Sequence, residues 1–143
     1  MFKTILLATD GSDLSNKAAQ STVRFAKEHG SKIVGLSVAT IYPYFPIIGV
    51  EMPSSDFIDA INKDAQKSVQ IIATLASEAG VPAEVHVVEG MSTYEEILKA
   101  AEKYNCDAIF MASHGRRGLD KLMLGSEAQK ILVHSKLPVT IFK

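Results

Sequence analysis

Short apolar runs alternate with longer amphipathic stretches along this chain, and no other feature of the sequence limits the fold more. Continuous apolar runs of this length are typical of strands that are buried on both faces. We therefore predict five strands, at Ile5–Thr9, Ile33–Val38, Ala83–Val88, Ala108–Met111 and Pro138–Phe142.

Two of the amphipathic stretches have clear helical periodicity. Apolar residues recur every three or four positions from Leu14 to Ala26 and again from Ile58 to Ala76, as one face of a helix requires. Gly30 and Gly80 follow these stretches at the position where a glycine ends a helix.

Two further helix starts are indicated by capping-box spacing, in which a serine precedes a glutamate or glutamine by three positions. Ser92 with Glu95 begins one such helix, and Ser126 with Gln129 begins the other. These helices would run to about residues 104 and 133.

Strands that alternate with helices predict an α/β fold with a parallel sheet and helices on both faces. At 143 residues, the chain has the length of one domain, residues 1–143. Because crossovers are right-handed, we expect a doubly wound five-stranded parallel sheet of order 3-2-1-4-5. In such a sheet the ligand crevice lies where the strand order reverses. That position brings Asp10 beside the loop after the fourth strand.

The segment Ala112–Ser126 combines three glycines and the adjacent Arg116 and Arg117, between a predicted strand and a predicted helix. Glycines let backbone N–H groups approach an anion, and the first N–H groups of a helix lack partners within it. The segment therefore indicates a phosphate site, with the arginines neutralising phosphate charge. A tight turn with an ordinary helix cap remains the alternative.

Composition restricts the class of partner. A net charge of −1 argues against a nucleic-acid binder with a broad basic face. Gly115–Gly118 matches the GxxG loop of KH RNA-binding domains, but that loop joins two helices and this one follows a strand. The N-terminal apolar run is too short for a signal peptide or a membrane span. The single Cys106 fits a reducing compartment, so we expect a cytoplasmic protein.

A long connection between the second strand and the second helix is the one departure from short loops. Thr40–Asp56 contains three prolines and the apolar patch Ile47–Val50. Long connections are often functional, so the segment is either a flap or partner surface, or an excursion without a role.

The chain resembles the single-domain, nucleotide-binding type of universal stress protein. The resemblance rests on ILLATDGSDLSNKA near the N-terminus and SHGRRGLDKLMLGSEAQKILVHSKLPVTIF near the C-terminus. The family's phosphate signature is Gly, two residues, Gly, nine residues, Gly, then Ser or Thr. This sequence matches with Gly115 and Gly125-Ser126, and Ala112 stands in place of the first glycine. We expect Ala112 to keep strand geometry and binding to survive, though more weakly.

The resemblance implies an ATP or AMP site, with or without Mg²⁺. Asp10 would face the ribose hydroxyls or a phosphate-bound metal. Other residues would line the base and nucleoside pocket, at Ala8, Thr9, Val38, Met111 and Ala112. Phosphates would be held by Gly115, Gly125, Ser126 and the backbone N–H of Glu127.

The resulting functional hypothesis is a non-catalytic stress-response regulator. Nucleotide would bias a homodimer formed through Pro138–Phe142, or another partner surface. A slow ATPase and a nucleotide-independent, chaperone-like module with Ile47–Val50 as its contact surface are the alternatives.

Overall fold

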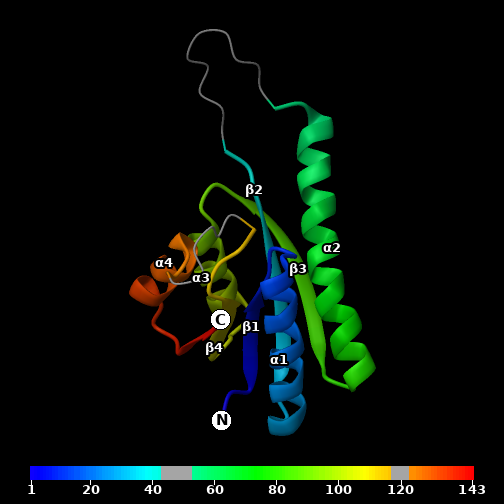
Figure 1. Cartoon of the computed structure of the whole chain (residues 1–143), viewed down its shortest axis with the longest axis vertical. Helices are drawn as coiled ribbons and strands as arrows, with labels where there is room; N and C mark the ends of the chain where they lie inside the picture. Colours follow the sequence, from blue (N-terminus) through cyan, green and yellow to red (C-terminus); the bar gives the residue numbers. More distant parts are fainter. Residues whose placement is uncertain (43–52, 117–122) are drawn as a thin grey trace.

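The computed structural model describes residues 1–42, 53–116 and 123–143. Its strands form a five-stranded parallel sheet of order β3-β2-β1-β4-β5 (Figure 1). The predicted fold class and strand order are confirmed. The strands are β1 Thr4–Ala8, β2 Lys32–Thr40, β3 Ala83–Gly90, β4 Ala108–Ala112 and β5 Val139–Phe142. The helices are α1 Asp13–His29, α2 Ser55–Ala79, α3 Thr93–Lys103 and α4 Ser126–His134.

Helices cover both faces of the sheet, as predicted. In Figure 1, α1 and α2 lie on one side and α3 and α4 on the other. The pleat of β1 serves both layers, because successive side chains point to opposite faces. Ile5 and Leu7 belong to the core cluster under α1 and α2, and Leu6 and Ala8 to the cluster under α3 and α4. Burial on both faces explains why the strands are continuously apolar.

Serines and glycines set the ends of α1 and α2. The side chains of Ser12 and Ser54 each accept a hydrogen bond from the backbone N–H three residues on, which satisfies a donor that the helix cannot. Gly30 and Gly80 end these helices in the left-handed conformation, as predicted. Helix α2 begins three residues before the predicted Ile58, because its serine cap precedes the first periodic apolar residue.

The predicted capping box at the start of α3 is wrong. Ser92 occupies the N-cap position, but its side chain makes no capping hydrogen bond. The Glu127 carboxylate, from the first turn of α4, accepts the Tyr94 backbone N–H at 2.9 Å instead. The Tyr94 backbone N–H of α3 is therefore capped from a neighbouring helix. The Glu95 side chain instead accepts from the Tyr94 hydroxyl at 3.2 Å.

The predicted loop Thr40–Asp56 is shortened at both ends. Strand β2 continues through Thr40, and α2 begins at Ser55. The apolar patch Ile47–Val50 lies outside the described residues. In the ranges that the structure describes, no helix is both long and apolar enough to cross a membrane.

Candidate functional site

The carboxyl ends of β1, β2 and β4 open on a cavity of about 450 Å³, at the point where the strand order reverses. The crevice therefore lies where the topology predicted it. Arg117 lies outside the described residues. Every other predicted site residue lines the cavity, namely Ala8, Thr9, Asp10, Val38, Met111, Ala112, Gly115, Arg116, Gly125, Ser126 and Glu127.

Several lining residues were not predicted. Some come from β2 and the residues just after it, and from α3. The others lie near predicted site residues, in α1, in the loop after β4 and in α4. Thr40 and Thr93 meet through their hydroxyl oxygens at 2.9 Å, which joins β2 to the start of α3. The unpredicted residues are Ser15, Leu36, Thr40, Tyr42, Thr93, Ile97, Ser113, His114 and Ala128. Only the alignment of strand ends in the sheet could have revealed most of them.

The N-terminus of α4 faces the cavity without a side-chain cap. Gly125, and not the predicted Ser126, is the N-cap residue, and glycine has no side chain with which to cap the helix. Gln129 donates to the Leu124 carbonyl oxygen at 2.7 Å, so the second predicted capping box is also wrong. Ser126 is instead the first helical residue. The first N–H groups of α4 have no intrahelical partner, and the helix dipole there favours an anion.

Gly125 is required by a close approach between two backbone segments. Its N–H donates to the Ser113 carbonyl oxygen at 2.7 Å. A Cβ at position 125 would lie 3.0 Å from that oxygen and 3.1 Å from the His114 Cα. Its φ of −62° is accessible to any residue, so the glycine provides space and not conformational freedom. Contact with the β4 loop thus holds the α4 N-terminus in position.

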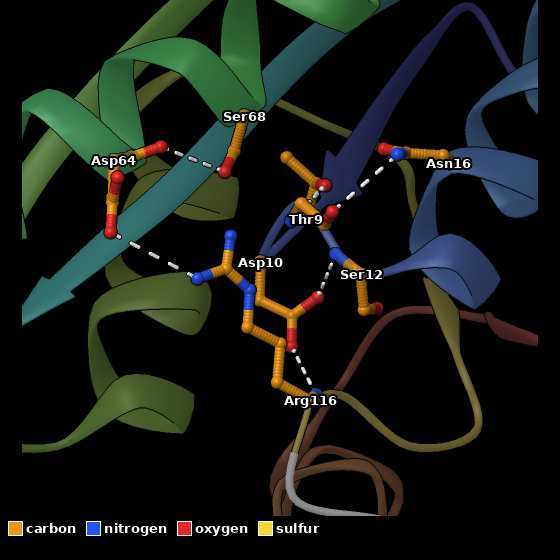
Figure 2. A network of polar contacts seen from close by, with 8 residues as sticks. Thr9, Asp10, Ser12, Asn16, Asp64, Ser68 and Arg116 are labelled. Carbon is orange, nitrogen blue, oxygen red and sulfur yellow. Dashed lines mark hydrogen bonds and ion pairs between the residues drawn. The ribbon is translucent and has the colours of Figure 1, made fainter.

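Asp10 is held by the two loops that flank the cavity (Figure 2). Its carboxylate accepts the Ser12 backbone N–H at 3.0 Å and the Arg116 backbone N–H at 2.9 Å. Gly115 packs against it so closely that a Cβ there would overlap Asp10 Oδ2. The carboxylate therefore links the loop after β1 to the loop after β4.

Burial of Asp10 by itself raises the pKa of its carboxyl group. The hydrogen bonds from Ser12 and Arg116 outweigh that effect, and the pKa lies below its ordinary value of 3.8. Asp10 is therefore an anion at neutral pH. Within the described ranges, no three His, Cys, Asp or Glu residues cluster as a metal site. For a phosphate-bound Mg²⁺, Asp10 would offer one carboxylate ligand, as predicted, and phosphate oxygens would complete the shell.

The side chain of Arg116 points toward α2 (Figure 2). Its Nη1 lies 4.0 Å from Asp64 Oδ2, and both side chains are more than half exposed. The Asp64 carbonyl oxygen accepts from the Ser68 hydroxyl at 2.9 Å. Arg116 thus bridges the loop after β4 and the second helix through one exposed ion pair.

Ala112 is the last residue of β4 and pairs with Phe142 of β5. Positive φ values among the described non-glycine residues occur only at Asn105, so Ala112 keeps strand geometry, as expected. The residue is 7% exposed and lines the cavity.

His114 lies in the loop after β4, and Cys106 lies just before that strand. The Ser113 hydroxyl lies 3.0 Å from His114 Nδ1, a contact that orients the loop. Cys106 is 7% exposed, and burial raises the pKa of its thiol to about 11. Burial and the raised pKa make the Cys106 thiol a poor nucleophile at neutral pH.

The chain is similar to known proteins over its full length. The universal stress protein family model matches residues 1–143. Universal stress protein YxiE of Bacillus subtilis is 33% identical, with 100% of both chains covered. Universal stress protein MJ0531 of Methanocaldococcus jannaschii is 30% identical, with 100% of this chain and 83% of that protein covered.

Solved structures have the same fold. A universal stress protein family protein from Arabidopsis thaliana with AMP bound has a TM-score of 0.71 at 18% identity, over 99% of this chain and 91% of that one. The universal stress protein from Archaeoglobus fulgidus in complex with dAMP has a TM-score of 0.69 at 16% identity, over 100% and 98%. The fold, the full-length family match and the curated relatives agree: the chain belongs to the universal stress protein family.

Proposed function

We propose that this protein binds an adenine nucleotide, ATP or AMP, in the cavity at the carboxyl ends of β1, β2 and β4. The observation that carries the proposal is the uncapped N-terminus of α4 facing that cavity. Two structures with this fold hold AMP and dAMP. A cavity of about 450 Å³ is within the usual range for small-molecule sites.

The chemistry of the lining divides the cavity into two parts. Apolar side chains and strand backbone would hold the base and the sugar, while loop amides and α4 would hold phosphate. Asp10 would accept hydrogen bonds from ribose hydroxyls or bind a phosphate-bound Mg²⁺. The nucleoside residues would be Ala8, Thr9, Val38, Met111 and Ala112, and the phosphate residues Gly115, Arg116, Gly125, Ser126 and Glu127. Arg117 is proposed as a further phosphate-binding residue, on the basis of the sequence alone.

The proposed role is regulation by occupancy and not catalysis. Both carboxylate oxygens of Asp10 already accept backbone N–H groups, which suits positioning better than proton abstraction. Slow ATP hydrolysis is the alternative. Phosphate release by purified protein above that of an Asp10→Ala variant would support it. The cytoplasmic location expected from the single cysteine stays a prediction.

We further propose that the protein forms a homodimer through β5, and that bound nucleotide acts on this dimer. Strand β5 is the edge strand beside β4. Pro138 and Phe142 offer their carbonyl oxygens to β4, so the alternate residues Val139 and Ile141 direct their backbone groups to the free edge. Unpaired edges invite a second strand. Light scattering should give the mass of two chains. The mass of one chain at all concentrations would contradict the proposed homodimer.

The binding test exploits the position of Ser126 as the first residue of α4. Proline is tolerated there because the N–H that it removes has no intrahelical partner. Gly125, with φ −62° and ψ 156°, already has the conformation that a residue before proline prefers. Ser126→Pro therefore deletes one phosphate donor and leaves the helix intact, while Ser126→Ala keeps the donor and serves as the matched control.

Isothermal titration with ATP and with AMP measures the outcome. We expect binding by the unmodified chain and by Ser126→Ala, and at least tenfold weaker binding by Ser126→Pro, with unchanged circular dichroism. Absence of heat for both nucleotides with the unmodified chain would refute the proposed function. Equal binding by the two Ser126 variants would place the phosphates elsewhere.

A further inference from the structure

Arg116 is held in two separate ways. Its backbone N–H donates to Asp10 at 2.9 Å, and Gly115 before it has no space for a side chain. The backbone of Arg116 is therefore fixed at the cavity wall. Its guanidinium, by contrast, is held by one exposed ion pair with Asp64, at 4.0 Å. The backbone is therefore held more strongly than the side chain, because exposed ion pairs contribute little to stability.

The resting position of the guanidinium is defined by the loop after β1 and by α2. A Cβ at Gly11 would lie 3.0 Å from Arg116 Nη2 and would overlap the Ser68 hydroxyl oxygen. Gly11 has a φ of +76°, which disfavours any other residue. The side chain thus lies beside Gly11 and extends toward Asp64 (Figure 2).

Arg116 also has a particular place in the charge distribution of the site. Of the described residues that line the cavity, it is the single arginine or lysine. The N-terminus of α4 provides amides for a phosphate group, but each additional phosphate brings charge that amides neutralise poorly. A guanidinium binds phosphate through paired, charge-assisted hydrogen bonds.

We propose that Asp64 and Arg116 together make the site sensitive to phosphate number, with Asp64 as the residue that competes for the guanidinium. This inference rests on the proposed nucleotide function. A polyphosphate draws the Arg116 side chain from Asp64, whereas a monophosphate bound at α4 leaves the ion pair in place. Asp64 therefore weakens ATP binding and leaves AMP binding unaffected, and a longer phosphate chain releases a contact between the site and α2.

The test is a comparison of ATP and AMP affinities by isothermal titration in matched variants. Asp64→Asn removes the competing charge and is expected to tighten ATP binding about two- to fivefold, the range for one surface ion pair, with no change for AMP. Glu78→Gln is the control, since it removes the same charge from the same exposed helix surface. It lies fourteen residues further along α2, roughly 20 Å away, and should change neither affinity.

A second comparison separates competition for Arg116 from simple charge repulsion. Arg116→Gln should lower ATP affinity and spare AMP, and adding Asp64→Asn to it should have no further effect. If Asp64→Asn tightens ATP binding equally with and without Arg116, or tightens AMP equally, the competition is refuted while nucleotide binding stands. If the unmodified chain binds neither nucleotide, the proposed function fails first.

Discussion

The packing of Gly115 on Asp10 gives a sharp prediction about the loop after β4. A Cβ at position 115 would overlap Asp10 Oδ2, so Gly115→Ala must displace the carboxylate. The displacement puts at risk the hydrogen bonds from Ser12 and Arg116, at 3.0 and 2.9 Å. No positive φ is found at Gly115, so backbone strain does not contribute.

The size of the effect follows from these two hydrogen bonds. Bonds to a charged group contribute about 1.5–3 kcal/mol each, and the low end applies because Asp10 is exposed enough for water to replace part of them. Alanine also restricts the unfolded chain, which offsets about 0.4–1 kcal/mol. We expect Gly115→Ala to lower the free energy of unfolding by about 2–2.6 kcal/mol, the two bonds at their low end less the alanine offset, as measured by urea denaturation.

A double-mutant cycle tests the cause. In an Asp10→Ala background the added Cβ no longer meets a carboxylate, so Gly115→Ala should cost nothing or stabilise by up to about 1 kcal/mol. The difference between the two backgrounds is the coupling between positions 10 and 115. An equal loss of stability in both backgrounds would mean that the glycine is needed for another reason, and the steric argument would be wrong.

Three further predictions concern other contacts. Because the folded pKa of Asp10 lies below 3.8, its ionisation stabilises the fold above that pH. The stability advantage over Asp10→Asn should therefore shrink as the pH falls below about 4 in urea titrations. Cys106, with its thiol pKa raised to about 11, should react slowly with a thiol reagent at pH 8 until urea unfolds the chain; equal rates would contradict its burial. Glu127→Ala should cost about 0.5–2 kcal/mol by removing the carboxylate that accepts the Tyr94 backbone N–H. Ser92→Ala, at a cap position without a side-chain hydrogen bond, should cost less than about 0.5 kcal/mol, and the reverse order would refute that assignment.

Local periodicity was sufficient for the strands and helices, because burial on both sheet faces forces the strands to be apolar. The strand order also needed the handedness of the crossovers. Helix starts were harder to predict. Ser12 and Ser54 cap their helices through their own side chains. Ser92 does not, and at the start of its helix Glu127 from another helix accepts the backbone N–H of Tyr94. A local pattern cannot reveal a partner that lies 33 residues away.

The same division applies to the site. From the order of residues alone came the parallel sheet, the crevice at the strand ends and the glycine-rich loop, since period, turn chemistry and crossover handedness are local or topological properties. Folding in three dimensions decided which groups remain available. Contact with Ser113 and His114 leaves little space for a side chain at Gly125, which is the N-cap residue of α4. The approach of α2 places Asp64 beside Arg116. These contacts depend on the distance between segments far apart in the chain, which only the packed structure determines.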